Sequence, residues 1–140
     1  MRKRTQSREF ALQVLYKIDI THDPADVALD NFWQDRKLED QEVEQELKDF
    51  TVELVLGVDS NLAALDPKIA QYATNWQMER MAVIDRNILR MGSFELIHRE
   101  DIPPKVTINE AVELAKKYSG SESGKFVNAI LDKIKQELGK

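Results

Sequence analysis

The 140-residue chain contains no cysteine, and this absence removes several kinds of chemistry at once. Disulfide bonds, thiolate nucleophiles and cysteine-based metal sites are all excluded. The chain also lacks an apolar run of about 18 residues, so no segment is expected to span a membrane. The basic start, MRKRTQSREF, is not followed by the apolar segment of a signal peptide, and we therefore expect a cytoplasmic protein.

Glycine is also scarce, and the one glycine-rich stretch, YSGSESGKFVNAIL, does not fit a nucleotide-binding loop. The P-loop pattern is G-x-x-x-x-G-K-[S/T], placed after a buried strand. Only three residues separate Gly120 from Gly124, and Phe126 stands where the hydroxyl side chain belongs. We instead predict a turn between two helices, in which Gly120 ends the first helix and Ser121 and Ser123 cap the second.

Residues suited to catalysis or metal binding are few. Of the two histidines, His22 lies in a predicted loop and His98 at a predicted helix end, where histidine more often stabilises terminal carbonyls than acts as a base. No nucleophile elbow and no calcium-loop spacing occurs. Asp23, Asp26 and Asp30 have helical spacing, but a solvated acidic face explains them better than a metal site. We expect no catalytic residue, no metal and no cofactor.

Charge is distributed unevenly along the chain. Residues 19–66 hold 14 acidic and 3 basic side chains, a net charge of −11, while the remaining residues carry +6. We expect the acidic segment to lie away from any surface that binds a polyanion. Cations gather in the last third, at Lys105, Lys116, Lys117 and Lys125. Lys125 and the amides of its helix start could meet an anion.

The basic N-terminus is the clearest candidate for an anionic partner. Four positive side chains precede the first acidic one, Glu9: they are Arg2, Lys3, Arg4 and Arg8. Such an arm favours RNA, although a solubilising, frayed terminus would explain the same residues.

Apolar residues recur with helical spacing through the whole chain, and no segment alternates as a strand does. Residues 81–98 are apolar over much of the helix circumference, which predicts a central buried helix stopped by DIPPK. Asp66-Pro67 predicts one helix start, and Thr107 with Glu110 predicts a capping box at another. We predict an all-α protein with a single compact domain, residues 1–140, of about seven helices.

Three segments resemble the NusB family of bacterial transcription antitermination factors: SREFALQVLYKID, DRNILRMGSFELIHREDIPPKVTINEAVELAKKYS and SGKFVNAILDKI. The resemblance is ordered and nearly full-length, and it is strongest from about residue 81 to residue 134. It implies an all-helical protein of two helical subdomains that is not an enzyme. It also implies binding to the small-subunit ribosomal protein NusE and to boxA, a short single-stranded element of ribosomal RNA transcripts, within an antitermination complex on RNA polymerase.

The resemblance also implies roles for particular residues. The protein-partner face would use Tyr16 and Asp85, with Arg90 either a neighbour of that face or a member of a structural ion pair. The RNA surface would use the basic arm and the turn near the C-terminus: Arg2, Lys3, Arg4, Arg8, Glu122, Ser123, Lys125, Phe126 and Asn128.

The sequence leaves some alternatives open. Thr5, Gln6 and Ser7 interrupt the arginine cluster typical of the family, so fewer charges would contact phosphate. Some ribosomal RNA cytosine methyltransferases share this domain, but the chain ends at Lys140 without a methyl-donor domain, which we take as an argument against an enzyme. A helical adaptor that binds only protein, with an incidental basic tail, is the alternative function. Self-association into a homodimer is also left open.

Overall fold

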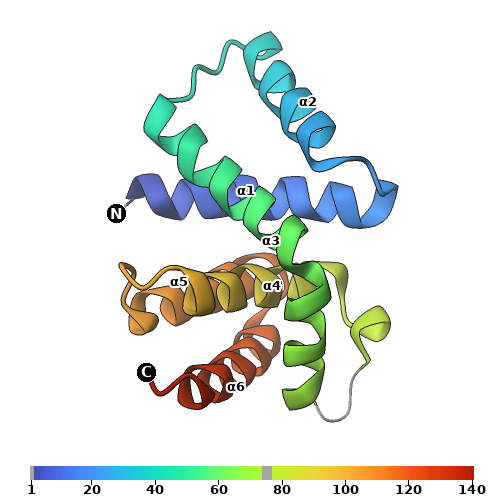
Figure 1. Ribbon diagram of the computed structural model, residues 1–140. Helices are drawn as coiled ribbons and strands as arrows, with labels where there is room; N and C mark the ends of the chain where they lie inside the picture. Colours follow the sequence, from blue (N-terminus) through green and yellow to red (C-terminus); the bar gives the residue numbers. More distant parts are fainter. Residues whose placement is uncertain (1, 74–76) are drawn as a thin grey trace. The chain divides into compact units, whose positions relative to one another are not determined.

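The computed structural model describes residues 2–73 and 77–140, and it contains no strand in these two ranges. The prediction of an all-α fold is confirmed. The described part of the chain holds six α-helices and one short 3-10 helix, where the sequence predicted about seven helices. In chain order they are α1 (Arg2–Thr21), α2 (Ala25–Leu38), α3 (Gln45–Tyr72), the 3-10 helix η1 (Met78–Arg80), α4 (Val83–His98), α5 (Pro104–Tyr118) and α6 (Ser121–Glu137), as shown in Figure 1.

The chain forms two compact units, an N-terminal unit (Met1–Asp59) and a C-terminal unit (Ser60–Lys140). The boundary falls inside α3, so this helix contributes to both units. The division agrees with the two helical subdomains that the resemblance implied.

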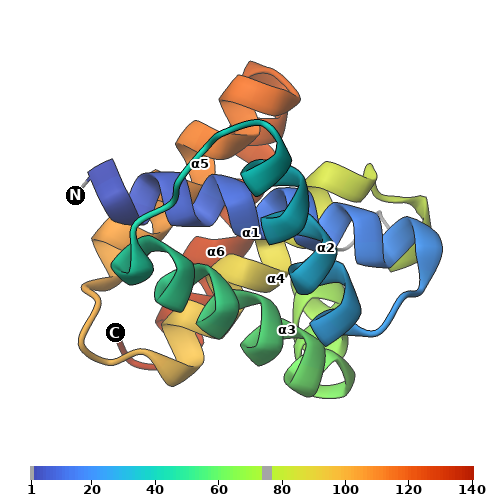
Figure 2. The ribbon, with the colours of Figure 1, turned by 90° about the horizontal axis from the view of Figure 1, so that it is seen from above.

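Aromatic packing holds α2 against α1 in the N-terminal unit, where Figure 2 shows the two helices with the start of α3. The ring of Phe10 meets Phe32 and Trp33 edge to face, with centroids 5.3 and 6.2 Å apart. The Arg36 guanidinium lies over the Phe32 ring, 4.6 Å from its centroid, in a cation–π contact with the cluster. This arrangement satisfies the quadrupole preference of aromatic rings and shields them from water.

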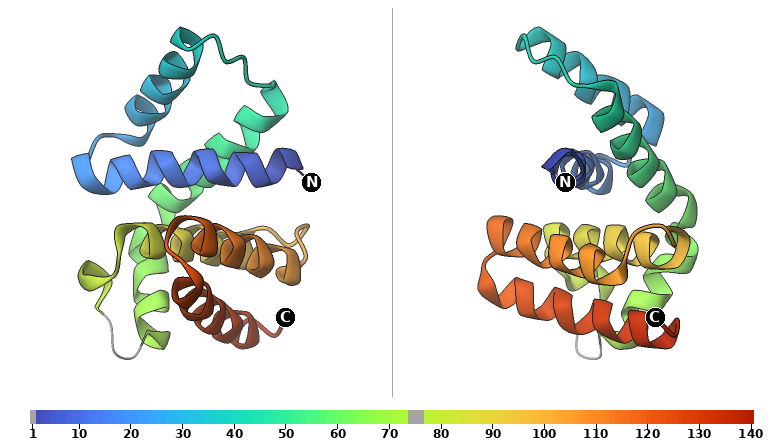
Figure 3. Two further views of the ribbon diagram at one scale, coloured as in Figure 1. Left: turned by 180° about the vertical axis from the view of Figure 1, so that it is seen from behind. Right: turned by 90° about the vertical axis from the view of Figure 1, so that its left-hand side faces the viewer.

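The C-terminal unit is built around α4, as its apolar sequence predicted. Asp85 and every residue from 87 to 96 are buried, and α5 and α6 pack against this helix (Figure 3). Gly92 permits the close approach of α6, because a Cβ atom there would lie 2.7 Å from Cδ1 of Leu131. Figure 3 shows α5 and α6 running beside each other on the same unit.

Both predicted helix starts were wrong. The α3 helix continues through Pro67, and the burial of Leu65 and Ile69 on either side outweighs the hydrogen bond that proline removes. Thr107 lies inside α5, which already begins at Pro104, and its buried hydroxyl donates to Glu95 Oε1 at 2.9 Å instead of capping a helix.

A partly buried ion pair joins α4 to the C-terminal part of α3. Arg90 Nε and Nη2 donate to the two carboxylate oxygens of Asp66 at 2.8 Å each. Arg90 Nη1 also donates to Asn87 Oδ1 at 3.1 Å. Such bidentate geometry is the strongest form of side-chain ion pair. Of the two roles that the sequence left open for Arg90, the structure shows the structural ion pair.

Replacing Arg90 by alanine should therefore cost stability. The change leaves the Asp66 carboxylate without its bidentate partner, and we expect the free energy of unfolding to fall by about 2–3 kcal/mol. Urea denaturation followed by circular dichroism measures this. Arg80→Ala, at an exposed position of η1, serves as the control and should change stability by about 0.5 kcal/mol or less. Equal midpoints for the two variants would contradict the assignment.

Candidate nucleic-acid interface

The basic arm begins α1, and acidic residues at the start of α3 engage it. Lys3 Nζ lies 3.0 Å from Glu44 Oε2 and 3.2 Å from Glu46 Oε2. The hydrogen bonds with Glu44 and then Glu46 stabilise the ammonium and raise the pKa of Lys3 above its ordinary value. Arg2 is the first residue of α1, and its side chain lies outside the part of the chain that the structure describes, so its predicted contact with RNA stays a prediction. Lys3 is half exposed, so an anion approaching it would compete with two carboxylates.

Arg4 and Arg8 share one aromatic surface. Their guanidinium carbons lie 4.6 and 5.3 Å from the centroid of the Phe50 ring on α3. Arg4 is exposed, whereas Arg8 is only 3% exposed. Arg8 therefore differs from the sequence prediction of an accessible phosphate contact: its cation packs against Phe50 within the protein. Arg4 keeps both the aromatic contact and access to solvent.

Part of the acidic segment lies beside the basic arm, whereas the sequence predicted that this segment lies away from a surface that binds RNA. A hollow of about 210 Å³ contains both charges, lined by Lys3, Arg4, Ser7, Glu46, Asp49, Phe50 and Glu53. The sequence missed Glu44 and Glu46 as partners of Lys3 because about 40 residues separate them along the chain, and no local pattern reports such a contact. Helix packing alone brings these groups together.

The second candidate surface lies in the C-terminal unit, at the turn between α5 and α6. Gly120 has φ 107°, in the region that favours glycine, and it precedes the first residue of α6, Ser121. The α5 helix ends at Tyr118 with Ser119 as its C-cap, and the Gly120 amide donates to Ala115 O at 3.0 Å, so the predicted turn between two helices is confirmed. The predicted serine caps are wrong: Gly120 occupies the N-cap position, and Ser123 Oγ instead donates to Asp85 Oδ2 at 3.1 Å.

The first two turns of α6 present a mixed polar surface. Lys125 and Asn128 are exposed, and Phe126 is half-buried. Lys125 Nζ lies 3.5 Å from the Glu122 carboxylate, a weak exposed pair that a phosphate could replace. Phe126 is only partly covered and directly follows this cation in the chain, and an aromatic residue of this kind is suited to stacking on a base.

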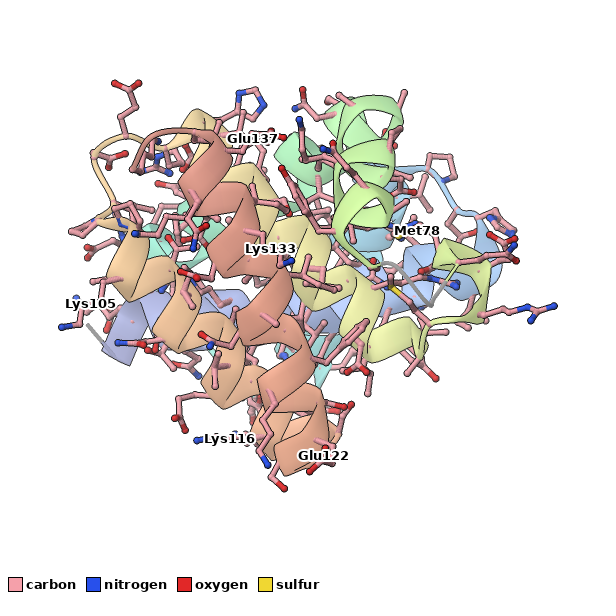
Figure 4. All side chains as sticks on the ribbon, turned by 90° about the horizontal axis from the view of Figure 1, so that it is seen from below. Met78, Lys105, Lys116, Glu122, Lys133 and Glu137 are labelled. Atoms are coloured by element: carbon pink, nitrogen blue, oxygen red, sulfur yellow. The ribbon has the colours of Figure 1, made fainter. Side chains whose placement is uncertain are left out.

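Close packing of α5 on α6 brings a further cation to this end of the unit. A Cβ atom at Gly124 would lie 3.0 Å from Cγ of Lys116, so glycine makes room for the aliphatic part of that lysine. Figure 4 shows Lys116 and Glu122 at the same end of the α5–α6 pair, with Lys133 and Glu137 farther along α6. Sequence reasoning noted Lys116 as a cation but did not place it in the site.

The residues assigned to a protein partner lie in different surroundings. Tyr16 is 43% exposed on α1, and Ile20, one turn later, is 55% exposed. The two side chains form an apolar strip of the kind that protein partners cover. Asp85, in contrast, is only 9% exposed in the first turn of α4, and Arg90 is committed to Asp66.

The structure thus brings some predicted residues together and separates others. Lys3 and Arg4 share a surface in the N-terminal unit, and Arg8 lies buried next to it against Phe50. Glu122, Ser123, Lys125, Phe126 and Asn128 share a surface in the C-terminal unit, and each surface is described within its own unit. No cluster of three or more potential metal ligands occurs in the described ranges. Within those ranges, no helix is both long and apolar enough to cross a membrane.

Comparison with known proteins gives a consistent family. The NusB family model matches residues 5–136. The transcription antitermination protein NusB of Anaeromyxobacter dehalogenans (strain 2CP-1 / ATCC BAA-258) is 47% identical over 136 residues, covering 97% of this chain and 92% of that protein. A solved structure of T. maritima NusB aligns with a TM-score of 0.85 and 32% identity, over 96% of this chain and 91% of that one. A solved complex of the antitermination factors NusB and NusE with dsRNA aligns with a TM-score of 0.84 and 26% identity, over 98% of each chain.

The acidic residues beside the basic arm should control the titration of Lys3. In the double variant Glu44→Gln, Glu46→Gln the ammonium loses both carboxylates, so the pKa of Lys3 should fall towards its ordinary value. An NMR titration of the lysine side chain measures this. Glu42→Gln, in the same exposed segment, is the control and should leave the Lys3 titration unchanged. A Lys3 pKa that does not move in the double variant would show that the ion pairs do not persist in solution.

Proposed function

The chain belongs to the NusB family, and from that premise we propose that it is a transcription antitermination factor that binds boxA-type single-stranded RNA together with the ribosomal protein NusE. In this proposal residues 1–140 act as one RNA-binding domain. The pair assembles on RNA polymerase and promotes transcription of ribosomal RNA in the cytoplasm. The protein works by binding and not by catalysis, and it needs no cofactor.

One observation carries the RNA-binding part of this proposal. The start of α6 combines an exposed cation, Lys125, with a half-buried aromatic ring, Phe126, and an exposed amide, Asn128. Single-stranded RNA is recognised by these three chemistries: phosphate neutralisation, base stacking and hydrogen bonds to base edges. The likeness to a NusB chain that was solved in complex with NusE and dsRNA supports binding to RNA and to NusE, while the preference for a single strand rests on the residues at the start of α6.

The basic arm supplies a second set of phosphate contacts. Arg4 is exposed and oriented by Phe50, and Lys3 can exchange its carboxylate partners for phosphate oxygens. Because Glu44 and Glu46 compete for Lys3, a polyanion gains less from the charge of this arm than the number of its cations suggests. This competition favours a specific RNA over an arbitrary one.

The contact with NusE is best supported on α1. Tyr16 and Ile20 form an exposed apolar strip, and aromatic residues in such strips contribute strongly to protein binding. A partner seated there would bring its own RNA-binding groups close to this chain. RNA and NusE would then bind cooperatively, because each reduces the cost of positioning the other.

A helical adaptor that binds only protein is the alternative, and RNA binding distinguishes it from the antitermination factor. We expect the chain to prefer a labelled boxA-type single strand over a scrambled strand and over a duplex, and NusE to tighten that preference. The logarithm of the affinity should fall with the logarithm of salt concentration, with a slope of about −0.7 for each phosphate neutralised. Fluorescence anisotropy across a salt series, with and without NusE, measures all of these quantities.

Two lysines of α6 provide a matched pair for the same assay. Lys125→Ala should weaken boxA binding and lower the salt slope by about 0.7, because one phosphate contact is lost. Lys133→Ala, farther along α6 as Figure 4 shows, should leave the affinity and the salt slope unchanged.

If the wild-type chain binds the boxA-type strand, the scrambled strand and the duplex equally weakly, and NusE does not change this, the result supports the protein-only adaptor instead.

A further inference from the structure

Asp85 occupies an unusual position for a residue expected to contact a protein partner. It lies in the first turn of α4, and its side chain is 9% exposed. One carboxylate oxygen, Oδ2, accepts a hydrogen bond from Ser123 Oγ at 3.1 Å. The carboxylate therefore faces the start of α6 within the C-terminal unit.

The other oxygen of Asp85 is costly to the fold. In the described part of the chain, no donor lies within hydrogen-bonding distance of Oδ1, which is itself buried. A buried acceptor without a partner is destabilising, although the positive end of the α4 dipole offsets part of the cost. The contact of Oδ2 with Ser123 nevertheless links the first turn of α4 to the first turn of α6.

Ser123 lies close in the chain to the candidate RNA-binding residues of α6. It is the third residue of α6, and Lys125 and Phe126 follow within the next turn. No side chain caps this helix, and the residue before it, Gly120, has a positive φ and no Cβ to restrict it. The hydrogen bond from Ser123 to Asp85 therefore adds a polar contact between the first turn of α6 and α4 to the apolar packing of α6.

We propose that Asp85 is a positioning residue for RNA: through Ser123 it holds the start of α6 so that Lys125 and Phe126 meet the strand together. The inference rests on the proposed function and gives Asp85 a different role from the protein contact that the resemblance implied. Binding to a fixed helix start loses less conformational entropy than binding to one that must be ordered first. RNA affinity should accordingly depend on a carboxylate that the RNA does not touch.

A double-mutant cycle tests the proposal in the full chain without NusE. Asp85→Ala and Ser123→Ala should each weaken binding of the boxA-type strand by about tenfold, the scale of one hydrogen bond to a charged group. The double variant should bind no more weakly than either single one, because both changes remove the same contact. Ser123→Thr keeps the hydroxyl and should restore most of the affinity. Ser121→Ala, an exposed serine in the same turn, should bind as the wild type does.

The outcomes separate this proposal from the proposed function. If Lys125→Ala weakens RNA binding while Asp85→Ala and Ser123→Ala do not, the positioning role is overturned and the RNA surface stands. Loss of NusE binding alone in Asp85→Ala would return that residue to the protein-partner face. If Lys125→Ala also has no effect, the RNA surface itself is overturned. Thermal unfolding of each variant verifies that it folds. If Asp85→Ala does not fold, the RNA affinity of Ser123→Ala, at the half-buried start of α6, tests the positioning role instead.

Discussion

The burial of α4 is the constraint on which the C-terminal unit depends. A helix that is covered on most sides holds its polar side chains away from water, so those side chains find most of their hydrogen-bond partners inside the protein. Three of them reach three different helices: Arg90 pairs with Asp66 of α3, Glu95 accepts from Thr107 of α5, and Asp85 accepts from Ser123 of α6. Apolar packing brings these helices together, and the polar contacts specify how each is oriented. The candidate RNA surface on α6 is therefore held from within by α4.

Acidic groups accompany the cations on both candidate surfaces. Lys3 pairs with Glu44 and Glu46 in the N-terminal unit, and Lys125 pairs with Glu122 in the C-terminal unit. Exposed ion pairs of this kind contribute little to stability, so their main effect is on what the cations can bind. An anion must replace a carboxylate on each surface, which reduces the binding free energy that charge alone can supply. Stacking and base contacts then determine which RNA binds. The net charge of −5 for the whole chain also weakens the attraction of a polyanion at long range.

Helical periodicity predicted the fold class and the buried central helix, because a helix that is apolar around most of its circumference is stable in water only when other helices cover it. Local signals failed where tertiary packing outweighed them: burial carried α3 through Pro67, and Thr107 found a partner in Glu95 rather than a cap. The residue types of the candidate site were readable from the sequence and its resemblance to a family. The contacts Lys3–Glu44 and Asp85–Ser123 could not be predicted from the sequence, because each joins residues far apart in the chain. The burial of Arg8 against Phe50 could not be predicted for the same reason.

Hydrogen exchange measured by mass spectrometry on the full chain, with and without the boxA-type strand, tests the central claim most directly. Backbone amides at the start of a helix have no intrahelical acceptor and exchange readily unless a ligand covers them. The account predicts that RNA slows exchange in the first turn of α6 and near the start of α1, while α2 is unchanged. Protection confined to α2, with the first turn of α6 exchanging as in the free protein, would contradict it.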